Sequence, residues 1–249
     1  MTRRDVIGRY RGSILGLVWA FLNPLIMLAV YTFLFGVVFK ARWGASSGDG
    51  HLEYALPLFI GLVVHGMFAE SVTRAPLLLL QHANLVKRVV FPLEILPWTL
   101  VAGALFHGAI SLAVWFVVAL ASGFRPSPTA LWLPVVLVPL VLFTMGCTWF
   151  LAALGVYVRD VSQVVALVVT LLLFLSPILY PASAVPAAYQ ALLFFNPLTV
   201  IVEQTRGILT GHALPDLGRL GAATAVDLAV AAAGLWSFQR TRRGFADVL

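Results

Sequence analysis

Charged residues are scarce in this chain: they make up 10% of its 249 residues, whereas hydrophobic residues make up 61%. A typical soluble domain carries about 25% charged and about 45–50% apolar residues. A soluble domain of this size could not bury so much apolar surface, and a disordered chain would not contain it. Since the apolar runs are long and unbroken, the sequence predicts an all-α integral membrane protein rather than a β-barrel.

Cysteine and lysine are almost absent. The single Cys147 excludes an internal disulfide and a thiolate metal cluster, and we interpret it as a packing residue. The two lysines, Lys40 and Lys87, do not follow a glycine, so the chain lacks the G-x-x-x-x-G-K-[ST] loop that cradles nucleotide phosphates. We therefore expect that this chain does not hydrolyse ATP by itself.

Motifs for metal binding and catalysis are also missing. The sequence has no H-E-x-x-H, and its five histidines are scattered along the chain. We predict no metal site and no catalytic residues.

The apolar runs predict six transmembrane helices, since a span needs about 20 mostly apolar residues. The expected spans are 14–38, 54–73, 95–121, 131–156, 161–180 and 217–238. The uncharged run 161–202 is too long for one span, and Pro177, Pro181, Pro186 and Pro197 divide it. The first run is too long for a signal peptide and is expected to be a retained span.

The basic residues are distributed unevenly between the two sides that these spans define. Eleven of the sixteen fall on one side and five on the other. The first set is Arg3, Arg4, Arg9, Arg11, Arg74, Lys87, Arg88, Arg159, Arg240, Arg242 and Arg243, and the second is Lys40, Arg42, Arg125, Arg206 and Arg219. The positive-inside rule then places both termini in the cytoplasm. The net charge of +6 reflects topology and contact with anionic lipid rather than nucleic-acid binding.

Residues 2–12 precede the first span and predict a short amphipathic helix in the cytoplasmic interface. Arg4, Arg9 and Arg11 lie outside an apolar arc that includes Tyr10. The helix either contacts an anionic headgroup or substrate, or serves only as topology-setting charge with a lipid anchor.

Residues 82–91 form a second segment that does not span, between the second and third spans. Leu85, Lys87 and Arg88 fit a short amphipathic helix, and Phe91 precedes Pro92, which disfavours α geometry there. A compact helix at the cytoplasmic surface suits docking of a partner protein, and the alternative is a connector that lies in the headgroups.

Residues 181–205 are apolar yet follow the fifth span on the outer side. A broken helical hairpin that re-enters the membrane, interrupted at Asn196-Pro197, would avoid exposing this apolar stretch to water. Glu203 and Arg206 are three residues apart and can pair on a helix. The hairpin, which begins at Pro181, is either a rim or gate of a pore or a packing plug.

Asp227 is the charged residue that falls well inside a predicted span, whereas Glu70 falls near the end of one. Charge inside a membrane is costly and often marks function. Asp227 either takes part in proton-coupled transport or makes a polar contact with a neighbouring helix.

Five segments, taken in order, resemble the membrane subunits of polysaccharide-exporting ABC transporters, a group that includes O-antigen, capsule and teichoic-acid exporters. They are "RDVIGRYRGSILGLVWAFLNPLIMLAVYTFLFGVVF" at 4–39, "NLVKRVVFPLEILP" at 84–97, "YVRDVSQVV" at 157–165, "NPLTVIVEQTRGIL" at 196–209 and "RRGFADVL" at 242–249. The first and last are closer to the O-antigen and teichoic-acid branch than to the capsule branch.

The resemblance implies a role for each non-spanning segment. Arg4, Arg9, Tyr10 and Arg11 would lie at the entrance for the substrate. Residues 82–91, with Asn84, Leu85, Lys87, Arg88 and Phe91, would be the coupling helix, and Arg159 and Asp160 a second cytoplasmic contact. Pro181, Asn196, Pro197, Glu203 and Arg206 would belong to the outer gate.

The resemblance also implies the assembly. Residues 1–249 would be one transmembrane domain, two copies of which form a channel in the bacterial inner membrane. Two copies of a separate ATPase subunit would bind ATP and Mg²⁺, so this chain would need no cofactor. The cargo would be a glycan linked to undecaprenyl pyrophosphate.

Other functions remain open on the sequence. The chain could be an ABC permease for another lipid or a drug, or a secondary carrier that depends on Asp227. A membrane enzyme acting on a lipid-linked sugar would need a carboxylate or histidine cluster at one interface, which we do not find.

Overall fold

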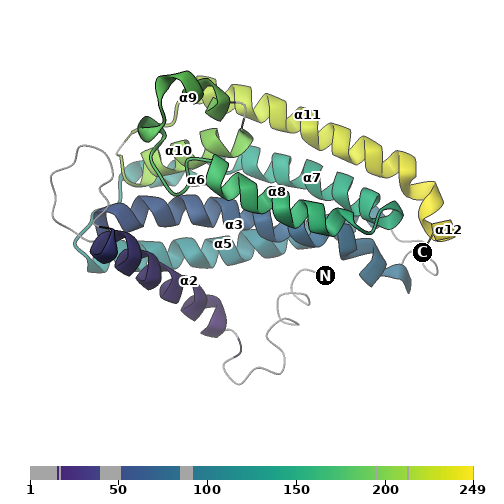
Figure 1. Cartoon of the computed structure of the whole chain (residues 1–249), viewed down its shortest axis with the longest axis horizontal. Coiled ribbons are helices and arrows are strands. Elements are labelled where there is room, and N and C mark those ends of the chain that lie inside the picture. The colour runs from purple at the N-terminus through teal and green to yellow at the C-terminus, as the bar shows by residue number, and fades with distance from the viewer. Residues whose placement is uncertain are drawn as a thin grey trace.

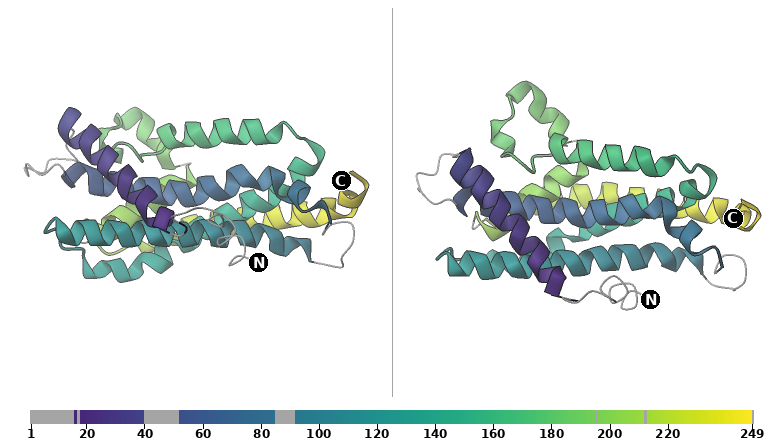
Figure 2. Two further views of the ribbon diagram at one scale, coloured as in Figure 1. Left: turned by 90° about the horizontal axis from the view of Figure 1, so that it is seen from below. Right: turned by 60° about the horizontal axis from the view of Figure 1, so that its bottom comes forward.

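The long apolar runs fold into helices that lie mostly side by side along the long axis of the molecule (Figure 1). The computed structural model describes residues 16, 18–39, 52–84, 92–194, 196–211 and 213–248, and these residues contain no β-strand. Helix α2 crosses its neighbours obliquely in each view, whereas α3, α5, α7, α8 and α11 are more nearly parallel (Figures 1 and 2). The described part of the chain is therefore all-helical, as the sequence predicts.

The elements follow one another in a simple order. They are α2 (Val18–Tyr31), the π-helix η1 (Thr32–Val38), α3 (Leu52–Gln81), η2 (Leu93–Ile95), α5 (Leu96–Ala121), η3 (Pro128–Trp132), α6 (Leu133–Val136), α7 (Val138–Tyr157), α8 (Val161–Leu175), η4 (Ala182–Ala184), α9 (Ala187–Phe194), α10 (Pro197–Leu209), α11 (Leu217–Thr241), η5 (Arg242–Gly244) and α12 (Phe245–Val248).

Five helical segments of the described chain are long and apolar enough to cross a membrane. They are Val18–Val38, Tyr54–Gln81, Leu93–Ala121, Pro128–Tyr157 and Leu217–Gly244. Five of the six predicted spans thus coincide with a helix of sufficient length. The remaining predicted span contains α8, which is shorter.

The fifth predicted span, 161–180, is longer than the helix that forms there. Helix α8 ends at Leu175 because of Pro177. A residue that precedes a proline avoids the helical conformation, and Ser176 is accordingly extended, with ψ of 151°. Its 15 residues measure about 22 Å, against about 30 Å for a hydrocarbon core. The chain then continues through Ser176–Tyr180 without a helix.

The second predicted span, 54–73, is shorter than the helix observed. Helix α3 continues through Pro76 to Gln81, and Ala75, Leu78 and Leu79 on this extension are buried. Their packing stabilises the helix beyond the point at which Arg74 suggested that the span ends. Glu70 consequently lies in the interior of a helix rather than near its end.

Prolines also divide the fourth predicted span, 131–156. Pro134 lies in the first turn of α6 and Pro139 in the first turn of α7, with Leu137 between the two helices. The sixth predicted span, 217–238, corresponds to α11, which continues to Thr241.

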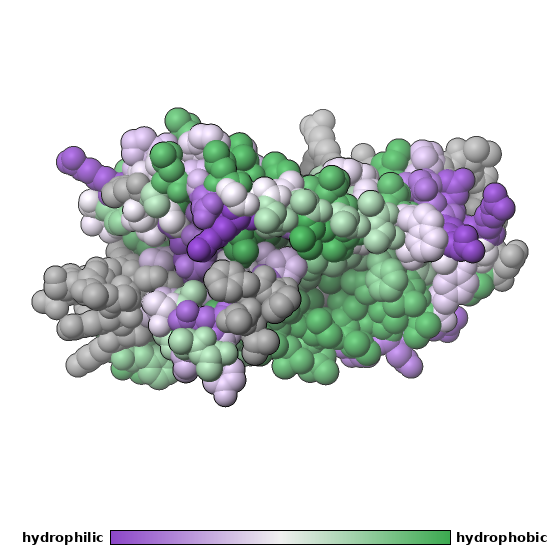
Figure 3. Space-filling view, turned by 90° about the horizontal axis from the view of Figure 1, so that it is seen from above, coloured by the Kyte–Doolittle hydropathy of each residue, from purple (hydrophilic) through white to green (hydrophobic). Residues whose placement is uncertain are grey.

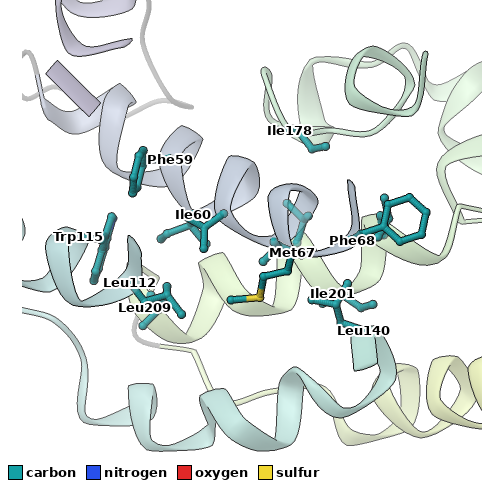
Figure 4. Close-up of a cluster of buried hydrophobic side chains, with 14 of the residues drawn as sticks. Phe59, Ile60, Met67, Phe68, Leu112, Trp115, Leu140, Ile178, Ile201 and Leu209 are labelled. Carbon is teal, nitrogen blue, oxygen red and sulfur yellow. The ribbon is translucent and has the colours of Figure 1, made fainter. Parts of the chain in front are cut away.

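Helix α3 runs through the centre of the bundle and carries much of its core. Figure 4 shows Phe59, Ile60, Met67 and Phe68 of α3 facing side chains from α5, α7 and α10, among them Trp115, Leu140 and Ile201. Trp115 is fully buried, and its indole Nε1 donates to the Leu56 carbonyl at 3.0 Å. This core fixes α10, which carries part of the outer segment, against the spanning helices.

Helices α7 and α11 approach each other closely because both have glycine at the contact. A Cβ on Gly234 would lie 2.1 Å from the Gly146 carbonyl oxygen, and a Cβ on Gly146 would lie 2.6 Å from that of Val230. Small residues at such crossings let membrane helices pack backbone against backbone.

Hydrophobic side chains cover a broad part of the surface between hydrophilic side chains that lie towards the two ends (Figure 3). The exposed apolar residues include Phe21 on α2, Phe33 on η1, and Leu167 and Leu171 on α8. Such a band suits contact with lipid acyl chains or with further membrane helices.

Candidate functional site

Two of the predicted site regions lie largely outside the described residues. These are the entrance residues Arg4, Arg9, Tyr10 and Arg11, and the coupling residues Leu85, Lys87, Arg88 and Phe91. Asn84, which was predicted to belong to the same coupling segment, is described and exposed just beyond the end of α3.

The second predicted cytoplasmic contact, Arg159-Asp160, forms the turn between α7 and α8. Both residues are exposed, and the Ser162 hydroxyl donates to the Arg159 carbonyl at 3.2 Å. The end of α7 is held against the end of α3, since a Cβ on Gly155 would lie 2.1 Å from the Pro76 carbonyl oxygen. The structure therefore brings this turn and Asn84 to the same end of the bundle (Figure 1).

The predicted outer segment, 181–205, together with the rest of α10 to Leu209 (called the outer segment from here on), occupies the opposite end of the bundle and consists of two unlike halves. Pro181 introduces η4 in an extended conformation, and α9 follows with Tyr189 61% exposed. In α10, by contrast, Leu198, Ile201 and Val202 are buried. One half thus lies over the surface while the other is part of the core.

The break between the two halves lies at Asn196-Pro197, as the sequence predicts. The Asn196 side chain caps α10 by accepting from the Leu198 N–H at 3.1 Å, and Pro197 occupies the first turn, where its missing N–H costs nothing. The Asn196 amide also donates to the Ser176 hydroxyl at 2.7 Å. The start of α10 is therefore fixed to the end of α8.

Arg206 is the best-connected side chain of the outer segment and is 4% exposed. Its Nε donates to the Pro57 carbonyl at 2.8 Å and its Nη2 to that of Ile178 at 2.6 Å. Its Nη1 donates to the Pro177 carbonyl and, at 3.0 Å, to Glu203 Oε1. The predicted pairing of Glu203 with Arg206 is confirmed, whereas the backbone contacts were not foreseen.

Burial lowers the pKa of Arg206 to about 10, and the neighbouring Glu203 carboxylate opposes that shift. The guanidinium therefore stays charged at neutral pH. It joins three parts of the chain: α3, the turn after α8, and α10.

Two further hydrogen bonds attach the outer segment to the spanning helices. The Tyr54 hydroxyl of α3 donates to the Leu179 carbonyl at 2.5 Å, and the Thr129 hydroxyl of η3 donates to the Ile208 carbonyl at 2.7 Å. Sequence reasoning missed both residues, because a tyrosine or threonine beside a long apolar run carries no distinctive pattern.

A cavity of about 500 Å³ lies between the two halves of the outer segment and the start of α11. Its lining includes Gln190, Glu203, Gln204, Asp216 and Arg219. Asp216 pairs with Arg219 at 3.2 Å, and its backbone N–H donates to the Gln204 side chain at 3.0 Å. These groups add several polar side chains to a cavity that is otherwise lined mainly by apolar ones.

Sequence reasoning also missed a polar pair in the interior of the bundle. His107 of α5 places its Nδ1 3.0 and 3.1 Å from the two carboxylate oxygens of Glu70 on α3, and Arg74 lies 3.8 Å from the same group. A cavity of about 410 Å³ adjoins this pair between α2, α3 and α5. The available signals were a histidine in the third span and the charge of Glu70 near the end of the second, and their pairing could not be identified without the length of α3.

Asp227 lies on α11 and is fully buried. From the sequence, a polar contact with a neighbouring helix was one explanation for a charged residue at this position inside a span. Neither of its carboxylate oxygens has a hydrogen-bond partner within the described part of the chain, so that explanation is not supported.

These features define a multi-pass membrane protein in which the segment that follows α8 is fixed to one end of the long helices. Residues 1–210 match the family model described as "ABC-2 type transporter". The chain belongs to this family of ABC transporter membrane domains.

Individual relatives extend over nearly the whole chain. It is 31% identical to the O-antigen export system permease protein RfbA of Myxococcus xanthus, over 99% of this chain and 93% of that protein. It is 26% identical to the RfbA permease of Klebsiella pneumoniae, over 100% of this chain and 93% of that protein. The daunorubicin resistance permease DrrB1 of Streptomyces coeruleorubidus is 28% identical over 77% of this chain and 68% of that protein.

Proposed function

We propose that the chain is the channel-forming permease subunit of an ATP-driven exporter that moves a lipid-linked, O-antigen-like polysaccharide across the inner membrane. The observation that carries this proposal is the similarity to O-antigen export permeases over 99–100% of the chain. Because the similarity extends over the full length, the outer segment, residues 82–91 and the turn at Arg159-Asp160 all have counterparts in those proteins.

The helices support a topology of six spans with both termini in the cytoplasm. Five helical segments have the length and composition of spans, and α8 would supply the sixth together with Ser176–Tyr180. The outer segment would then re-enter the membrane. The burial of α10 among α3, α7 and α11 supports this, since residues inside the bundle cannot also lie in the outer aqueous phase.

The exposed turn at Arg159-Asp160 and the nearby Asn84 support a docking surface for an ATPase at the cytoplasmic end. Two copies of that partner would bind ATP and Mg²⁺ and transmit their closure through residues 82–91 and this turn. The rim of a protein interface is polar and solvent-accessible, and exposed charged side chains such as these suit a rim.

Two copies of this chain would enclose the path of the glycan. The exposed apolar side chains of α2 and α8 support such pairing, because they leave apolar surface that further helices could cover. The arginines of 2–12 would receive the anionic pyrophosphate of an undecaprenyl-linked glycan, since guanidinium groups bind phosphate oxygens through paired hydrogen bonds.

Reconstitution tests the proposal directly. The chain is co-expressed with a candidate ATPase subunit, purified as a complex and inserted into liposomes with a fluorescent lipid-linked oligosaccharide. We expect ATP-dependent transfer of the glycan across the bilayer and two copies of each chain by native mass spectrometry. ATP-independent transfer, or a chain that never retains an ATPase, would contradict the proposal.

Export of a drug is the second candidate, and the similarity to the daunorubicin resistance permease favours it. The same liposomes distinguish the two functions, since a drug exporter would move an anthracycline and leave the lipid-linked glycan in place. A secondary carrier would instead transport without ATP and would lose activity in Asp227→Asn.

A further inference from the structure

The cavity of about 500 Å³ beside the outer segment, the outer cavity, lies where α9, α10 and the start of α11 meet (Figure 1). Its volume falls in the range of about 300–1,000 Å³ that small-molecule sites occupy. Glu203, Gln204 and Gly207 of α10 line it, whereas Leu198 and Leu209 on the opposite side of the same helix are buried in the core. One side of α10 is thus left for an open space rather than for packing.

The charged groups that line the outer cavity are paired. Glu203 Oε1 lies 3.0 Å from Nη1 of Arg206, and Asp216 Oδ2 lies 3.2 Å from Nε of Arg219. Within the described lining, each carboxylate therefore has a guanidinium partner, and no charge is left unbalanced. An anion would meet two carboxylates, and a cation would compete with a guanidinium for each of them. This arrangement favours a ligand that is polar but neutral.

Three side chains of the lining keep hydrogen-bonding atoms that the described chain does not use. Gln190 donates its amide N–H to the Val185 carbonyl at 2.9 Å, which leaves its own carbonyl oxygen. Gln204 accepts from the Asp216 N–H at 3.0 Å, which leaves its NH₂ group. Glu203 uses Oε1 in its ion pair and keeps Oε2. None of these atoms is among the polar atoms that are buried without a partner, so all three are open to solvent.

Two acceptors and one NH₂ donor beside an apolar wall suit the hydroxyl groups of a sugar. Each hydroxyl both donates and accepts, so neighbouring hydroxyls of a pyranose can satisfy carbonyl, carboxylate and amide groups together. Leu193, Val200 and Leu214 supply apolar surface for the C–H side of the ring. The described lining contains no aromatic side chain on which a ring could stack, so a sugar would be held by hydrogen bonds and only weakly.

We propose that the outer cavity is a subsite for one neutral hexopyranose unit, held through Gln190, Glu203 and Gln204. The inference rests on the proposed function, since a glycan cargo brings such units to the outer end of a permease. Weak binding suits this role, because a site along a transport path must release what it binds. By holding a unit between successive cycles of the ATPase, the subsite would oppose backward movement of the glycan.

Binding of simple sugars to the full-length chain, without the ATPase, tests the subsite. Saturation-transfer difference NMR is recorded on the chain in lipid nanodiscs with the methyl pyranosides of glucose, mannose and galactose, one at a time. We expect saturable binding of at least one of them, with a dissociation constant in the millimolar range, and none to empty nanodiscs. The corresponding uronic acid glycoside adds a carboxylate to the ring and should bind severalfold more weakly, because Glu203 and Asp216 line the cavity.

Variants assign the binding to the outer cavity. Gln190→Leu removes the amide at similar size, and Gln204→Glu keeps the acceptor for the Asp216 N–H while removing the NH₂ donor. Each should raise the dissociation constant severalfold. Gln239 is an exposed glutamine of α11 near the opposite end of the molecule, so Gln239→Leu and Gln239→Glu are the matched controls and should bind the sugar unchanged. Thermal unfolding shows whether each variant is folded.

Three results would overturn the inference. They are no binding of any of the three sugars, binding that is unchanged in a folded Gln190→Leu or Gln204→Glu, and tighter binding of the uronic acid than of the neutral sugar. ATP-dependent transfer of the glycan without sugar binding would reject the subsite and keep the export function. Sugar binding in a complex that transfers no glycan would reject the export function and, with it, the assignment of the cavity to the cargo.

Discussion

The guanidinium of Arg206 on α10 lies 2.8 Å, Nε to oxygen, from the Pro57 carbonyl on α3. The same group binds the carbonyls of Pro177 and Ile178, so α10, α3 and the turn after α8 share one charged side chain. Hydrogen bonds to charged groups contribute about 1.5–3 kcal/mol each. A movement that opens the outer end must therefore carry α10 and α3 together, or take place in the exposed α9.

Removing this guanidinium should destabilise the fold. Arg206→Ala leaves three buried carbonyls without their donor, and we expect a loss of about 3–5 kcal/mol, as for other broken buried pairs. Thermal unfolding in detergent measures it as a lower Tm. Arg219→Ala is the control, because its 66% exposed side chain forms a surface pair worth about 0–1 kcal/mol. Equal losses in the two variants would contradict the central role of Arg206.

Gly61 provides a second test of the same junction from the side of α3. A Cβ at this position would lie 2.6 Å from Arg206 Nη2 and 3.3 Å from Ile178 Cγ2. Gly61→Ala should therefore displace the guanidinium and lower the Tm. Gly66→Ala on the same helix meets no atom within 4 Å and should be neutral or stabilising, since alanine favours a helix by about 1 kcal/mol. If Gly61→Ala left the Tm unchanged, the Arg206 side chain would be free to move away from the added methyl group, which contradicts this prediction.

The spans and the break at Asn196-Pro197 could be predicted because they depend on local properties, namely apolar length and proline geometry. The end of α8 and the extension of α3 were less predictable. Pro177 stops one helix, whereas Pro76 is accommodated in the other by the burial of Leu78 and Leu79. Tertiary packing decides between these outcomes, and a single sequence does not show it.

The candidate site was predictable only where its contacts are close in sequence. Glu203 and Arg206 are three residues apart, so their pairing follows from helical spacing. The contacts of Arg206 with Pro57, and of Glu70 with His107, join residues on different helices. Their partners depend on the relative register of the helices, which no local pattern gives.

The contact between α7 and α11 should be sensitive to a single methyl group. Gly234→Ala would place a Cβ 2.1 Å from the Gly146 carbonyl oxygen, so the helices must separate. Overpacking of this kind costs about 1–3 kcal/mol, and we expect a lower Tm. Gly221→Ala on the same helix has no atom within 4 Å and should not lower it. Similar behaviour of the two variants would contradict the close approach.

Glu70 and His107 should show a measurable energetic coupling. We expect Glu70→Gln and His107→Ala each to destabilise the chain, and the double variant to lose less than the sum of the two. Contacting residues typically couple by about 0.5–3 kcal/mol in such cycles. Chemical unfolding of the four proteins gives the coupling. Additive losses would show that the 3.0 Å contact contributes nothing to stability.

The turn at Arg159-Asp160 should matter for assembly rather than for folding. Both side chains are exposed, so Arg159→Glu should leave the free energy of unfolding of the isolated chain unchanged to within about 0.5 kcal/mol. If this turn contacts the ATPase, the reversed charge should reduce the amount of ATPase that co-purifies and the ATP hydrolysis of the complex. Reversed charge at an interface also lowers the association rate, and this loss is sensitive to salt.

Arg243→Glu is the matched control for this variant, because Arg243 is also an exposed arginine and follows α11 at the same end of the bundle. It makes the same change in net charge without altering the turn between α7 and α8. ATPase retention should therefore fall in Arg159→Glu and persist in Arg243→Glu. Equal retention in the two would place the docking surface away from this turn, and equal loss would show a general charge effect of the cytoplasmic end.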